Sequence, residues 1–154
     1  MNKTLTAPIQ PNEIEWRVQS KKPGQMTIVP YITNRCVMER FDKAFGADNW
    51  TSEFREITNG FICRLTVITK DRTIYREDGA SKTNIEPEKG GISDAMKRAA
   101  VQFGLGRDLY NYPRVMVACD DNYIPNWAYS KLEKLTTWIN EGKCDRAIIV
   151  IENK

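Results

Sequence analysis

The chain has 154 residues, of which 41% are hydrophobic and 28% charged, and its formal net charge is +3. These values are typical of a soluble globular domain with a substantial core, and no apolar run reaches membrane-spanning length. The absence of histidine removes the commonest general base and the usual nucleophilic triads. Since the N-terminal residues lack the apolar segment of a secretory signal, the sequence predicts a cytoplasmic protein.

Four cysteines are spread along the chain, and none of them forms a Cys-x-x-Cys pair. They are Cys36, Cys63, Cys119 and Cys144. A zinc site would have to gather all four from distant segments, so buried, reduced thiols are the better interpretation. We therefore expect neither a metal site nor another cofactor.

The first third of the chain predicts an arm, two extended segments and a helix. Residues 1–13 are polar with two prolines and predict a flexible arm. Residues 14–19 and 26–30 read as extended, with a turn signal between them. From about Ile32 to Phe45 the apolar residues have helical spacing, and the helix is predicted to be capped by Thr33 or Asn34 and to end at Gly46.

The next segment predicts an antiparallel meander of three strands. The strands cover residues 52–57, 61–69 and 73–78, and short turns join them. The middle strand alternates, so one of its faces is apolar enough for a core. The residues of that face are Phe61, Cys63, Leu65 and Val67.

A loop is predicted over residues 79–91, followed by a helix from about Ile92 to Phe103 that packs on the meander. Its apolar stripe has near-ideal helical spacing and contains Ile92, Ala95, Met96, Ala99, Ala100 and Phe103. Phe103 is predicted to be buried against the sheet, and Gly104 suits the C-cap.

The remainder predicts an irregular stretch, a helix over about Trp127–Ile139 and a terminal strand over residues 146–151. The fold class is therefore α+β. It has a β-β-β-α core in which the meander packs on a helix, together with an N-terminal and a C-terminal helix. We expect one domain over residues 1–154.

Two adjacent cations, Lys97 and Arg98, fall opposite the apolar stripe and allow two interpretations. One is a solvated helix face. The other is a groove that binds a phosphate backbone, to which Arg55 and Arg64 of the strands would add, as would Arg35 and Arg40 of the first long helix. A groove of this kind is expected to use about one stacking aromatic residue, and the candidates are Tyr75, Tyr110 and Tyr112.

An acidic cluster leaves an enzyme as an alternative. Glu77, Asp78, Glu86 and Glu88 suggest a Mg²⁺-dependent nuclease, although their spacing matches no defined motif. Solvated strand ends and loops are the simpler interpretation.

The pattern "AFGADNW", a meander ending in "REDGAS" and then "ISDAMKRAAVQFGLG" resembles the Rad52-type family of single-strand annealing proteins. The resemblance covers about residues 30–112. It implies a core over about 26–113, a C-terminal helical extension over about 120–154, and a small bacterial or phage-like member that acts in a bacterial cell or an infected host. It also implies a ring of subunits that holds single-stranded DNA in a basic groove, without enzymatic chemistry.

By motif, the resemblance makes Lys97 and Arg98 the backbone contacts. Arg35 lies one position from the family's further arginine, and Val101 stands where the family often has another cation. The missing contact is expected from Arg64, Lys82 or Arg107, and Arg55 completes the candidate set. The expected partners are single-stranded DNA, other copies of the chain and a host single-stranded DNA-binding protein. A coating protein that does not anneal strands remains the alternative.

Overall fold

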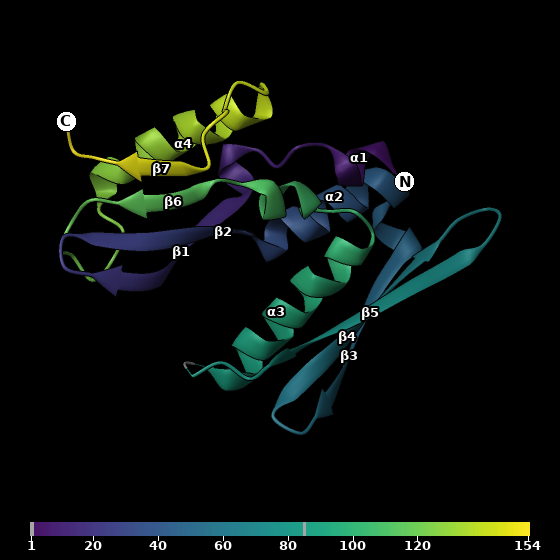
Figure 1. The fold of residues 1–154 in the computed structure, drawn as a ribbon. Coiled ribbons are helices and arrows are strands. Elements are labelled where there is room, and N and C mark those ends of the chain that lie inside the picture. The colour runs from purple at the N-terminus through teal and green to yellow at the C-terminus, as the bar shows by residue number, and fades with distance from the viewer. Residues whose placement is uncertain (1, 85) are drawn as a thin grey trace. The chain divides into compact units, whose positions relative to one another are not determined.

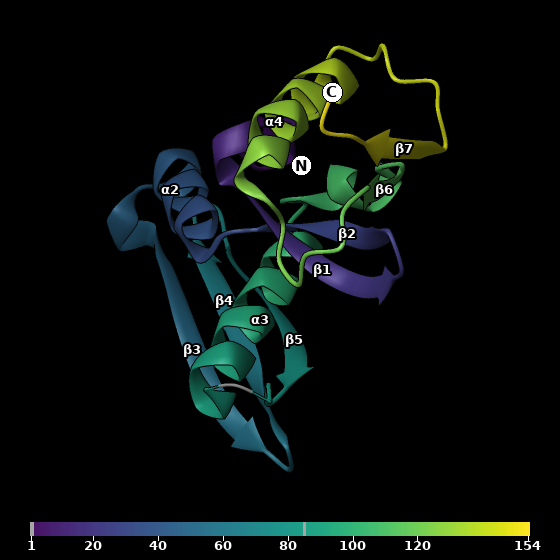
Figure 2. The same ribbon diagram turned by 90° about the vertical axis from the view of Figure 1, so that its left-hand side faces the viewer.

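The computed structural model describes residues 2–84 and 86–154, which form two compact units (Figures 1 and 2). Unit 1 comprises the chain up to Ala7 and Thr33–Arg107, and unit 2 comprises Pro8–Ile32 and Asp108–Lys154. Both units combine helices with a sheet, which confirms the α+β fold class. One cooperative domain over the whole chain stays a prediction. No helix of the described residues is both long enough and apolar enough to cross a membrane.

Unit 1 is the predicted meander with its helices. Its elements are α1 (Lys3–Thr6), α2 (Asn34–Phe45), η2 (Ala47–Asn49), β3 (Trp50–Ile57), β4 (Gly60–Ile68), β5 (Thr73–Ser81) and α3 (Pro87–Gln102). The strands form an antiparallel sheet of order β3-β4-β5, and α3 packs on β4 and β5 (Figure 1). The predicted apolar face of β4 is buried, and Thr33 caps α2 by accepting a hydrogen bond from the N–H of Cys36 at 3.0 Å.

The loop predicted over residues 79–91 is too long, because β5 continues to Ser81 and α3 already begins at Pro87. The two glycines of that segment read as loop residues, yet they lie within the helix. A Cβ on Gly91 would lie 2.7 Å from Cδ2 of Phe61, so the missing side chain lets α3 approach the sheet closely. The helix ends as predicted at Gly104, whose φ is 101°. Its N–H donates to the Val101 carbonyl at 2.9 Å, and that of Leu105 to the Ala100 carbonyl at 3.3 Å, which is a Schellman motif.

Four aromatic rings join α2, β3 and the end of α3. Phe41 is fully buried, and its ring centroid lies 5.6 Å from Phe45, 5.4 Å from Trp50 and 5.5 Å from Phe103. The prediction that Phe103 is buried against the sheet is wrong. Phe103 is half-buried and packs edge-on against Phe41, because it follows the last turn of α3, where the chain leaves the sheet.

The N-terminal arm is not loose along its whole length. Residues 3–6 form α1, and Leu5 is buried. Arg40, which sequence analysis considered as a contributor to a phosphate-binding groove, is buried in α2 and donates to the carbonyls of Thr4 at 2.9 Å and Ala7 at 2.8 Å. The arginine thus satisfies carbonyls at the end of α1, a role that could not be read from its helical spacing.

Unit 2 is built on a second sheet. Its elements are η1 (Pro11–Glu13), β1 (Ile14–Lys22), β2 (Gln25–Ile32), η3 (Arg107–Asn111, which enters from unit 1), β6 (Arg114–Val117), α4 (Asn126–Asn140) and β7 (Ile148–Ile151). The strand order is β1-β2-β6-β7, with β6 and β7 parallel. Leu132 and Leu135 of α4 share the core with Ile149 and Ile151 of β7. Strand β6 lies in the stretch that was predicted to be irregular. The sequence did not predict this strand, because four residues are too few to show a period.

Replacing Phe41 with alanine should lower the free energy of unfolding by about 3–5 kcal/mol, because the change empties the centre of the aromatic cluster. Phe103→Ala should cost less, since that ring is only half-buried. Tyr110→Ala, at an exposed position, should stay within about 0.5 kcal/mol of the wild type. Urea unfolding followed by circular dichroism measures all three. Equal losses for Phe41 and Phe103 would contradict the packing described.

Candidate nucleic-acid interface

The outer face of the meander, which is turned away from α3, carries two arginines that form ion pairs with the same carboxylate. The register places Arg64 of β4 directly opposite Glu53 of β3 and Glu77 of β5. Arg55 Nη1 and Arg64 Nε lie 2.8 Å and 2.9 Å from the same Glu77 Oε1. We call Arg55, Arg64, Tyr75 and Glu77 the arginine face.

The charges of this face stabilise one another. Hydrogen bonds from Arg55 and then Arg64 hold the pKa of the Glu77 carboxyl below its ordinary value of 4.5. The hydrogen bond to Glu77 likewise raises the pKa of Arg64. Glu77 and Arg64 are therefore both charged at neutral pH. An arginine paired in this way can exchange the carboxylate for another anion.

Tyr75 is the aromatic residue of the arginine face. The guanidinium carbon of Arg64 lies 4.4 Å from the centroid of its ring, and the residue is 54% exposed. Of the other two stacking candidates, Tyr110 is exposed in η3. Tyr112 is half-buried, and its ring centroid lies 6.2 Å from that of Trp16. Burial raises the pKa of Tyr112, as expected of a packing residue. Tyr75 alone combines an exposed ring with an adjacent cation in the meander.

Arg98 of α3 lies against the opposite face of β5. Its Nε lies 3.3 Å from Asp78 Oδ1, and Gln102 donates to Asp78 Oδ2 at 3.3 Å and to the Glu77 carbonyl. Because successive side chains of a strand point to opposite faces, Glu77 and Asp78 take partners from the two sides of the sheet. One dipeptide thus binds three of the predicted DNA-binding arginines.

The prediction that Lys97 and Arg98 both lie opposite the buried stripe of the helix is wrong. Lys97 is only 7% exposed. Arg98 belongs to the row of Gly91, Ala95 and Gln102, which faces the sheet, and its long side chain reaches past β5 to solvent. The apolar stripe did not reveal this arrangement, because buried residues occupy more than one side of α3.

The remaining cations lie in separate places. Lys82 Nζ is 2.7 Å from Glu56 Oε1, a hydrogen bond that raises the pKa of the lysine. Arg107 donates from Nε and Nη2 to the carbonyls of Val101 and Gln102, each at 2.8 Å, and so caps the end of α3. Arg35 is exposed in the first turn of α2. Unit 1 thus brings together Arg55 with Arg64, whereas Arg98 and Lys82 lie on the helix-bearing side of the sheet.

The acidic cluster does not form the metal site that a nuclease would need. Glu77 and Asp78 bind arginines, and Glu86 Oε2 lies 3.4 Å from Lys89 Nζ. Within residues 2–84 and 86–154, no three carboxylate, cysteine or histidine side chains are grouped to hold a metal ion. All four cysteines are free, and burial raises the pKa of Cys63 to about 12, so this thiol is not a nucleophile at neutral pH.

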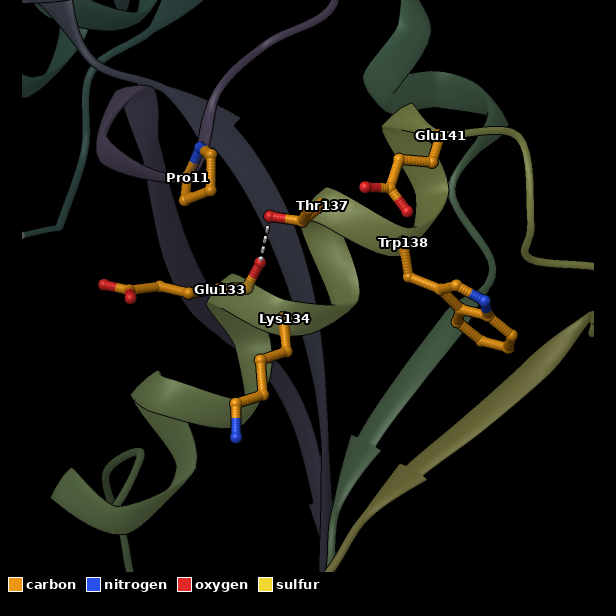
Figure 3. A pocket seen from close by; sticks show the side chains of 6 residues that line it. All are labelled: Pro11, Glu133, Lys134, Thr137, Trp138 and Glu141. Carbon is orange, nitrogen blue, oxygen red and sulfur yellow. Dashed lines mark hydrogen bonds between the residues drawn. The ribbon is translucent and has the colours of Figure 1, made fainter.

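Unit 2 has an open pocket of about 340 Å³ beside α4. Its lining residues are Pro11, Glu133, Lys134, Thr137, Trp138 and Glu141. Figure 3 shows Glu133, Lys134 and Trp138 pointing in different directions, and Thr137 donating to the Glu133 carbonyl at 3.1 Å. The pocket therefore lacks a converging set of polar groups, which a small-molecule site needs.

Sequence analysis missed the roles of Glu77, Asp78 and Gln102. It weighed the two carboxylates as part of a Mg²⁺ site and preferred solvated strand ends and loops. The available signal was the alternation of Glu77 and Asp78 on a strand flanked by arginine-bearing elements. Which arginines these carboxylates bind depends on the register of the strands and on where α3 packs on the sheet. The sequence specifies neither by itself.

The chain is similar to a family of DNA-repair proteins and to two proteins named for binding single-stranded DNA. The model of the Rad52/22 family, described as double-strand break repair protein, matches residues 1–128. A protein of Deinococcus radiodurans named single-stranded DNA-binding protein DdrA is 30% identical over 142 residues, covering 83% of this chain and 67% of the relative. The protein of the same name from Deinococcus deserti is 32% identical over 142 residues, with 83% and 69% covered.

The Glu77 carboxyl should titrate below its ordinary pKa of 4.5, and Arg55→Ala or Arg64→Ala should each move its pKa upward. A carboxyl with a lowered folded pKa stabilises the fold above its unfolded pKa, and this contribution is lost as the pH falls through the folded pKa. NMR titration of the Glu77 side chain measures the shift, with Arg146→Ala in unit 2 as the control. An unchanged titration in the Arg55→Ala/Arg64→Ala double variant would show that the ion pairs do not form in solution.

Proposed function

The chain belongs to the Rad52/22 family of double-strand break repair proteins, and on that premise we propose that it binds single-stranded DNA and anneals complementary strands in homologous recombination and repair. The observation that carries the proposal to this chain's own residues is the set of exposed arginines on unit 1. Arg55 and Arg64 lie on the outer face of the meander, and the side chain of Arg98 reaches solvent past β5.

Phosphate recognition follows from the chemistry of these side chains. A guanidinium donates paired hydrogen bonds to phosphate oxygens, and backbone contacts position a strand without reading its sequence. Tyr75 supplies an exposed ring on which a base can stack. Lys82 and Arg35 add charge at exposed or half-exposed positions, whereas Lys97 and Arg107 are proposed to act through the shape of α3.

The proposed activity needs no covalent step, so we propose neither a catalytic residue nor a cofactor. Pairing of complementary bases drives annealing, and the protein's part is to hold a strand with its bases accessible. We place this activity in the cytoplasm of a bacterial cell or phage-infected host, where a host single-stranded DNA-binding protein is the proposed further partner.

A coating protein that protects strands without annealing them is the second candidate. The name of the two Deinococcus relatives favours it as much as annealing, because that name states only binding to single-stranded DNA. Both candidates require the same arginines. They differ in whether a bound strand pairs faster with its complement than a free strand does.

The protein should accelerate pairing of two complementary oligonucleotides, and Arg98→Ala should reduce both this rate and the affinity for a single strand. Removing one phosphate contact should lower the slope of log affinity against log salt by about 0.7. The loss should be similar for oligonucleotides of different sequence. A fluorescence-quenching assay measures pairing, and anisotropy at several salt concentrations measures affinity.

Arg146→Ala is the matched control, since it removes an exposed arginine from unit 2. Lys97→Ala is unsuitable as a binding test, because Lys97 is buried and its loss would also disturb α3. Binding without faster pairing would select the coating function. Equal affinities and slopes for wild type and Arg98→Ala would remove Arg98 from the interface.

We also propose that the chain forms a homo-oligomer, as a closed ring. Strand β3 is an edge strand whose residues Thr51–Ile57 are all exposed, and such edges aggregate unless they are paired or covered. Head-to-tail contacts that close into a ring would cover them. Sedimentation velocity at micromolar concentration should show a species several times heavier than 17.7 kDa. A monomer that anneals strands at the same concentration would contradict the ring.

A further inference from the structure

The arginines proposed to bind the strand are already hydrogen-bonded to carboxylates in the chain without DNA. Arg55 and Arg64 share Glu77, and Arg98 binds Asp78. The side chains of these arginines are 41–57% exposed, whereas those of Glu77 and Asp78 are 27% and 28% exposed. The carboxylates therefore lie beneath the guanidinium groups, which stay open to solvent.

From this arrangement we infer that Glu77 and Asp78 are positioning residues that set how tightly the protein holds a strand and how readily it releases it. This inference rests on the proposed function. A guanidinium donates hydrogen bonds to a carboxylate and to a phosphate with similar geometry. Each carboxylate therefore occupies the place of a phosphate until the strand arrives. Binding is then an exchange of anionic partners, and a strand that leaves is replaced at once by the carboxylate.

Such an exchange weakens binding in a way that suits annealing. A protein that must hold a strand and then give up a duplex gains little from maximal affinity. Each ion pair that has to be broken lowers the affinity, and the returning carboxylate promotes dissociation. Among variants of one interface, changes of this kind alter the dissociation rate more than the association rate.

The hydrogen bonds also keep the arginines in place between binding events. Glu77 holds Arg55 of β3 and Arg64 of β4 side by side, so the two guanidinium groups do not have to be gathered when a strand binds. Gln102 assists Asp78 in the same way, because its amide contacts both the Asp78 carboxylate and the Glu77 carbonyl. A neutral amide at position 77 or 78 would keep the shape and remove the competing charge.

The test compares Glu77→Gln, Asp78→Asn and the double variant with wild type, using a labelled oligothymidylate in anisotropy and stopped-flow dissociation. Each single variant should bind about two- to tenfold more tightly at low salt, with slower dissociation. Its slope of log affinity against log salt should steepen by about 0.7 for the charge released. The double variant should bind most tightly and release a preformed duplex most slowly.

Two controls separate local pairing from overall charge and shape. Glu53→Gln removes the same charge from the same face, opposite Arg64, but in the described chain Glu53 makes no hydrogen bond to that arginine. It should have a smaller effect than Glu77→Gln. Glu77→Asp keeps the charge and should therefore bind the strand less tightly than Glu77→Gln. Circular dichroism melting shows whether each variant keeps its fold.

Affinities equal to or below wild type in folded Glu77→Gln and Asp78→Asn would overturn the inference and leave the proposed function standing. If the wild type binds no oligonucleotide, the proposed function fails instead. The inference is then decided with inorganic polyphosphate as the probe. Tighter binding of polyphosphate by the two variants than by wild type would support it, and unchanged binding would refute it.

Discussion

The close approach of α3 to the meander is the contact on which the rest of unit 1 depends. Gly91 and Ala95 present almost no side chain to β4, and the ring of Phe61 fills the space where a Cβ of Gly91 would lie. At this distance Arg98 and Gln102 reach the edge of β5, and Phe103 reaches Phe41 of α2. A bulkier helix face would lift all of these side chains off their partners at once, because they share one rigid element.

Alternation along β5 then decides the electrostatics. Since Glu77 and Asp78 are adjacent in a strand, they serve opposite faces of the sheet, and each face receives one carboxylate among its arginines. This explains how a chain with a net charge of only +3 can present several arginines without a large unbalanced field. Exposed ion pairs are worth about 0–1 kcal/mol each, so their exchange for phosphates is within reach of ordinary binding energies.

The sequence predicted those parts of the fold in which one period controls a whole element. The meander, α2 and α4 were found because their apolar residues repeat strictly at two or at three and four positions. The prediction from sequence failed where a tertiary contact overrides the local structural preference of the residues. Gly90 and Gly91 suggested a loop but lie in a helix, β6 is too short to show a pattern, and Lys97 is buried although it is charged. For the site, the arginines were identified individually, whereas their carboxylate partners required the strand register.

The family match ends at residue 128, in the first turn of α4, yet the fold of unit 2 depends on the residues beyond that point. Leu132 and Leu135 of α4 and Ile149 and Ile151 of β7 belong to the core of that unit, and β7 pairs in parallel with β6. Lys131 secures this end of the chain by donating to the carbonyls of Glu152 and Lys154. All the arginines of the proposed interface lie in unit 1, within the matched residues. The segment after residue 128 therefore completes a sheet that carries none of these arginines, and the packing of that sheet's core constrains the sequence of the segment.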